Sequence, residues 1–75
     1  MPPLPTSFGV ILPVAERREL IAYDRLGTVR WNRTLQSEVV FTAVDHEGNL
    51  FFTDRSNALH ALSATGQPLW SIPYL

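Results

Sequence analysis

Short apolar runs alternate with short polar clusters along this chain, at nearly even spacing. Residues 39–44 are mostly β-branched or aromatic, and a polar cluster follows at 45–48. The same pattern returns at residues 49–53, 58–62 and 69–72, with polar segments rich in Asp, Asn, Ser and Gly between them. Runs of this length, bounded by turn residues, predict strands joined by hairpins. Since no stretch carries apolar residues at a helical period, we expect an all-β fold.

The first half of the chain has the same signals in a shorter form. Residues 9–14, 19–23 and 28–33 have the strand pattern, whereas residues 1–8 form a proline-rich leader in which we expect no strand. Because short turns connect antiparallel neighbours, the sequence predicts about seven short antiparallel strands. The second half would hold four of them and the first half three.

An internal repeat explains this division. Shifting the sequence by 39 residues aligns five identities: Gly9 with Gly48, Leu20 with Leu59, Ala22 with Ala61, Gly27 with Gly66, and Trp31 with Trp70. These pairs include all four glycines and both tryptophans of the chain. A four-stranded unit of about 40 residues that repeats is typical of a β-propeller. We therefore expect a β-propeller fragment, with a partial blade (strands two to four) at 9–36 and a complete four-stranded blade at 37–75.

The repeated positions resemble the tryptophan-docking motif of PQQ-like β-propeller repeats. These positions are Ala22, Asp24, Gly27 and Trp31 in the first copy, and Ala61, Ser63, Gly66 and Trp70 in the second. The resemblance implies that Ala packs in the third strand, Gly makes the turn, and Trp docks its ring against a neighbouring blade. Ser63 departs from the Asp that is usual at its position. The family includes quinoprotein dehydrogenases and the outer-membrane β-barrel assembly lipoprotein.

A second resemblance covers residues 43–54, which are similar to NHL repeats and gluconolactonase-like propellers. Those propellers normally lack the two tryptophans at these places. In this interpretation Asp54 or Asn57 would be a divalent-metal ligand, since carboxylates and carboxamides suit hard cations. One repeat does not supply a full ligand set, so we expect no metal site.

Catalytic chemistry has little support in the sequence. In the quinone-dependent enzymes the cofactor lies at the centre of a closed propeller, with calcium and often a cysteine pair, whereas this chain has no cysteine and few blades. Asp54, Ser56 and His60 suggest a hydrolase, but residues of these types also satisfy backbone donors in turns. No Gly-x-Ser-x-Gly motif is present. We expect no catalytic residue and no bound cofactor.

Composition narrows the choice of partners. Six basic and seven acidic residues leave a net charge of −1, with no basic excess for nucleic acid. The longest apolar run, residues 10–15, is far short of the roughly 20 residues that span a bilayer, so we expect no membrane segment. The start of the chain does not resemble a signal peptide. An extracytoplasmic location is suggested by the PQQ-like resemblance alone.

The sequence therefore favours a non-catalytic repeat segment that acts as a scaffold or protein-interaction module. Its expected partners are other propeller blades, copies of itself, or another protein, because a chain of 75 residues with open strand edges buries little of its own surface. The alternative is a fragment of a propeller enzyme, either a PQQ-dependent dehydrogenase or an NHL or gluconolactonase-like hydrolase.

Overall fold

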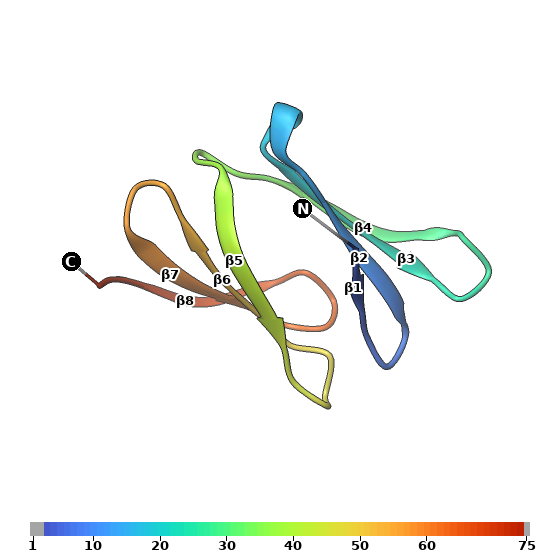
Figure 1. Ribbon diagram of the computed structural model, residues 1–75. Coiled ribbons are helices and arrows are strands. Elements are labelled where there is room, and N and C mark those ends of the chain that lie inside the picture. Colours follow the sequence, from blue (N-terminus) through green and yellow to red (C-terminus); the bar gives the residue numbers. More distant parts are fainter. Residues whose placement is uncertain (1–2, 75) are drawn as a thin grey trace.

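The computed structural model describes residues 3–74, and over these residues the chain forms eight strands and one 3-10 helix. They are β1 (Leu4–Pro5), β2 (Gly9–Val14), η1 (Ala15–Arg17), β3 (Glu19–Asp24), β4 (Val29–Thr34), β5 (Val39–Val44), β6 (Leu50–Asp54), β7 (Ala58–Leu62) and β8 (Pro68–Pro73). Within each half of the chain, consecutive strands pair antiparallel, which gives one sheet of order β1-β2-β3-β4 and another of order β5-β6-β7-β8. Figure 1 shows the two sheets side by side, with one connection running from β4 to β5. The expected all-β class is confirmed.

β1 is the strand that the sequence did not predict. It lies within residues 1–8, where we expected a leader without a strand, and it pairs with β2 so that Leu4 faces Ile11. The first sheet is therefore four-stranded rather than partial, and the described residues hold eight strands instead of seven. A two-residue strand is too short to show an alternating pattern. Pro5 is tolerated because β1 lies at the sheet edge, where a missing N–H breaks no ladder. Residues 1, 2 and 75 of the expected segments lie outside the described residues.

Four hairpin turns share one hydrogen-bonding pattern, although their sequences differ. Each starts with a side-chain oxygen that accepts hydrogen bonds from the backbone N–H groups two and four residues later. The four starting residues are Asp24, Asp45, Asp54 and Ser63. The residue three positions on has a left-handed backbone, with φ of 85° at Gly27, 88° at Gly48, 63° at Asn57 and 84° at Gly66. A tight turn followed by one left-handed residue is a common connection in β-hairpins. The hydroxyl of Ser63 takes the place of a carboxylate oxygen without changing the turn.

The two sheets correspond strand by strand, but not at one constant offset. We call a row of residues that are paired across neighbouring strands a rung. Equivalent rungs are Ile11–Ala22–Trp31 in the first sheet and Phe51–Ala61–Trp70 in the second. The third and fourth strands are thus 39 residues apart, whereas the second strands are 40 apart. The identity of Gly9 with Gly48 is one residue out of register, because Gly48 is a turn residue and Gly9 lies at the start of β2. A shift of one residue in the alignment is significant, because neighbouring side chains of a strand point to opposite faces of the sheet.

The hydrophobic core lies between the two sheets. Its buried members are Ile11, Leu20 and Ala22 from the first sheet and Leu50, Phe52 and Leu62 from the second. Half-buried apolar side chains surround this cluster, namely Leu4, Phe8, Trp31, Leu35, Val39 and Val44. Each sheet therefore covers one face of the other, and the remaining face of each sheet has no cover within residues 3–74.

Candidate functional site

The indole of Trp31 joins the two sheets. It projects from β4, and its Nε1–H donates a hydrogen bond of 3.0 Å to the carbonyl oxygen of Ala64, in the turn between β7 and β8. The ring also lies on Gly66, where an added Cβ would come within 2.6 Å of Cδ2 of Trp31. Only glycine permits this approach, and the left-handed backbone at Gly66 favours glycine independently. We call this arrangement the Trp31–Gly66 contact.

Two further contacts support it, and the sequence analysis identified neither. The Nε–H of Arg33 donates a hydrogen bond of 2.9 Å to the carbonyl oxygen of Gly66. Phe8, just before β2, packs on the turn that follows β5, 3.4 Å from the position of a Cβ on Gly48. Neither Arg33 nor Phe8 has an identical residue 39 positions later, so the repeat carried no signal for them.

The structure places the residues of the repeated motif in matching positions but in different surroundings. Ala22 and Ala61 are fully buried, next to the tryptophan of their own rung. Asp24 and Ser63 begin equivalent turns. The structure brings Trp31 together with Gly66 and does not bring Trp70 together with Gly27: Trp70 is 46% exposed, and a Cβ on Gly27 would meet no heavy atom of the described residues within 4 Å, chain neighbours aside.

The uncovered face of the second sheet is strongly apolar, and we call it the Trp70 face. It carries Phe41, Phe51, Leu59, Trp70 and Ile72. The exposed fractions are 73% for Phe41 and 50% for Ile72. A shallow groove of about 160 Å³ runs between Phe41, Phe51 and Leu59, and the Trp70 ring centroid lies 6.2 Å from that of Phe51. Large apolar side chains gathered on one uncovered face are typical of a contact surface.

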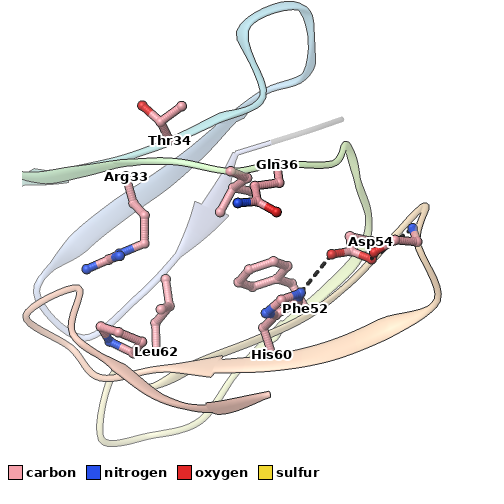
Figure 2. A pocket seen from close by; sticks show the side chains of 10 residues that line it. Arg33, Thr34, Gln36, Phe52, Asp54, His60 and Leu62 are labelled. Carbon is pink, nitrogen blue, oxygen red and sulfur yellow. Dashed lines mark hydrogen bonds and ion pairs between the residues drawn. The ribbon is translucent and has the colours of Figure 1, made fainter. Parts of the chain in front are cut away.

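A cavity of about 250 Å³ opens between the sheets, where the connection after β4 passes over β6 and β7 (Figure 2). It is lined by Arg33, Thr34, Leu35, Gln36, Phe52, Asp54, Ser56, His60, Leu62 and Pro68. Figure 2 shows the side chain of Arg33 above Leu62, and the pair of Asp54 and His60 at the other end. The cavity therefore has a basic and an acidic end over an apolar floor.

Asp54 organises the polar end of this cavity. Its Oδ2 accepts a hydrogen bond of 2.7 Å from Nε2 of His60, because an ionised carboxylate has no proton to give. Its Oδ1 accepts one of 2.6 Å from the hydroxyl of Ser56. The imidazole stacks on Phe52, with centroids 4.6 Å apart. A serine hydrolase needs the histidine between serine and carboxylate, whereas here the carboxylate lies between Ser56 and His60. The cluster is thus arranged to hold the β6–β7 turn.

The same contacts decide the ionisation of Asp54. Burial by itself raises the pKa of a carboxyl group, because it disfavours the charged form. In Asp54 the hydrogen bonds from Ser56, His60 and the Ala58 N–H outweigh burial, and the pKa lies below its ordinary value of 3.8. Asp54 is therefore a charged, fully engaged acceptor at neutral pH.

Neither a metal centre nor a membrane-spanning helix emerges from the described part of the chain. Within residues 3–74 no three His, Asp or Glu side chains are grouped so as to hold a metal ion. Asn57, considered above as a ligand, occupies the left-handed position of the β6–β7 turn. No helix in this range is long and apolar enough to cross a membrane.

Fold and contacts together define a segment of a β-propeller, in which two four-stranded blades pack face to face. No protein-family model and no curated protein sequence matches the chain. Among solved structures, it is similar to BamB from Moraxella catarrhalis, with a TM-score of 0.71 and 18% sequence identity. The match covers 96% of this chain and 23% of BamB, so the chain spans about a quarter of that propeller. At this identity the likeness shows the fold alone.

Alanine variants at Gly66 and Gly27 distinguish the effect of the inter-sheet contact on stability from the effect of backbone strain in the turn. The two glycines have nearly the same φ, so alanine causes similar backbone strain at both. Only Gly66→Ala also pushes Cβ into the Trp31 ring, and we expect it to lower the free energy of unfolding by about 1–3 kcal/mol more than Gly27→Ala. Urea unfolding followed by circular dichroism measures both. Equal losses would contradict the Trp31–Gly66 contact.

The lowered pKa of Asp54 predicts a stability that depends on pH. A carboxyl group whose pKa is lower in the folded state stabilises the fold above its unfolded-state value, and this contribution disappears as pH falls through the folded-state value. We expect wild type to exceed Asp54→Asn in unfolding free energy above pH 3.8, and the difference to shrink below it. Urea unfolding at several pH values gives the comparison. A difference that grows on acidification would show that the hydrogen bonds do not outweigh burial.

Proposed function

We propose that the chain is a non-catalytic β-propeller segment built from PQQ-like repeats, and that it acts as a scaffold or protein-interaction module. The observation that carries this proposal is the unequal state of the two equivalent tryptophans. Trp31 is docked on the neighbouring sheet, whereas Trp70 occupies the same rung position and is 46% exposed. The repeat therefore presents one docking residue that the described chain does not use.

The positions of the motif residues support the PQQ-like assignment. Both alanines are buried in the third strand of their sheet, and both glycines make the following turn. Of the two tryptophans, Trp31 docks on the other sheet, as the family resemblance implies. NHL and gluconolactonase-like repeats normally lack these tryptophans, so an assignment to those repeats would not account for the Trp31–Gly66 contact.

The surface chemistry supports a role in binding protein. The Trp70 face is apolar, and its counterpart on the first sheet is the face that packs on the second sheet. The Trp70 face is therefore suited to pack on another β-sheet, as the equivalent face of the first sheet does on the second sheet. Fold by itself does not determine function, so the argument rests on this face and its unused tryptophan.

The cavity between the sheets does not fit the quinone cofactor of the PQQ-dependent enzymes. That cofactor carries three carboxylates, whereas the carboxylate of Asp54 occupies one end of the cavity. At the other end the Nε–H of Arg33 is engaged with the carbonyl of Gly66. At the Asp54 end, the residues present would repel a ligand of this charge.

Alanine substitution of the two tryptophans tests the proposal. Trp31→Ala removes a ring docked between the sheets, and we expect it to lower the unfolding free energy by about 3–5 kcal/mol. Trp70→Ala removes a half-exposed ring, and we expect a loss of no more than about 1 kcal/mol. Urea titrations of dilute samples measure both. A Trp70→Ala loss as large as that of Trp31→Ala would place Trp70 in the chain's own core and exclude it as a binding residue.

A ligand titration tests the non-catalytic part separately. We expect the melting temperature to stay the same when PQQ and calcium are added together, because ligands stabilise only a folded state that binds them. Differential scanning fluorimetry with wild type and Asp54→Asn provides the measurement. A saturable rise in wild type that Asp54→Asn loses would contradict the proposal and favour a fragment of a propeller enzyme.

A further inference from the structure

The contact between the two sheets joins two different surfaces. It has a donating side, the face of the first sheet that carries Trp31, and a receiving side, the turn from Ser63 to Gly66 on the second sheet. Since the two sheets are equivalent by repeat, each sheet has both sides. Within residues 3–74, one donating side and one receiving side pack together, and one side of each kind is left uncovered.

The unused donating side is the Trp70 face. Its central rung, Phe51–Ala61–Trp70, is equivalent to the rung that ends in Trp31. Ile72 takes the place of Arg33, so this side lacks one hydrogen-bond donor and offers an apolar contact instead. It is the more apolar of the two donating sides.

The unused receiving side lies on the first sheet, around the turn from Asp24 to Gly27. In this turn the side chain of the first residue accepts the same two backbone hydrogen bonds as in the turn from Ser63 to Gly66. The φ angle of its glycine is 85°, against 84° at Gly66. Gly66 is buried beneath Trp31, whereas Gly27 is exposed. Leu26, at the tip of this turn, is 91% exposed. Tyr23, which precedes the turn, occupies the position that Leu62 has in the second sheet, and Leu62 is only 3% exposed.

We infer that the Trp70 face of one copy docks on the first sheet of a second copy. Trp70 covers Gly27 of that copy, and its indole N–H donates to the backbone carbonyl of Arg25, the counterpart of Ala64. The inference rests on the proposed function and names its partner. A second copy is the occupant that the chain itself specifies, because the two uncovered surfaces have the same relation as the two that already pack together. The net charge of −1 per copy gives little repulsion between copies.

The contact joins two different surfaces, so it is head-to-tail. Repeated head-to-tail contacts close into a ring when their rotation fits, and otherwise continue into a filament. Propellers have about 4–8 blades, and this chain supplies two, so a closed ring would contain about two to four copies.

Two single-face variants and their mixture test this arrangement by size-exclusion chromatography with light scattering. Trp70→Glu blocks the donating side, Tyr23→Glu blocks the receiving side, and His46→Glu places the same charge on an exposed turn outside both. We expect wild type and His46→Glu to associate with rising concentration, and each single-face variant to stay monomeric. An equimolar mixture of the two should give a species of twice the chain mass and no larger, because one intact contact remains.

Several results would overturn the inference. Wild type could remain monomeric at all concentrations, Tyr23→Glu could associate as wild type does, or the mixture could stay monomeric while both variants fold. The indole N–H of Trp70 in unmodified chain gives a second measurement, since its exchange with solvent should slow as concentration rises. If Trp31→Ala destabilises the chain but wild type stays monomeric, only self-association fails. If Trp31→Ala has no effect, the proposed function fails as well.

Discussion

The approach of an indole ring to a residue without a Cβ is the contact on which this structure depends. Trp31 lies on Gly66, and its N–H finds the carbonyl of Ala64, so a large aromatic surface is buried without leaving its donor unpaired. The approach requires a left-handed turn at Gly66, which the hydroxyl of Ser63 closes, and a small residue, Ala22, beside the ring. With the ring in place, the buried side chains of both sheets meet in one core.

The repeat places the residues of this contact at equivalent positions in both sheets. Each sheet has one side that donates a docking tryptophan and one side that receives it. When two sheets pack together in this way, one donating side and one receiving side stay uncovered. The polar residues that suggest chemistry have a different role: Asp54 gathers His60, Ser56 and backbone donors around one turn. These contacts hold the turn between β6 and β7 in place.

Sequence reasoning succeeded where a local pattern has a local cause. The strand at 39–44 follows from its β-branched and aromatic residues, and the turns with Asp or Gly follow from the conformational needs of tight turns. It failed where the cause is a partner elsewhere in the fold. β1 forms because β2 offers it a free edge, and Arg33 joins the two sheets because the carbonyl of Gly66 lies within its reach. The false match of Gly9 with Gly48 shows that identical residues need not occupy identical positions.

The sequence by itself determined the all-β class, the order of the strands, and a motif that places alanine, glycine and tryptophan at matching points of two units. It did not determine which tryptophan docks on the other sheet, because Trp31 and Trp70 occupy equivalent positions in the repeat. Burial depends on whether a complementary surface lies against the ring. The tertiary structure decided this by placing the Gly66 turn over Trp31 and leaving Trp70 46% exposed.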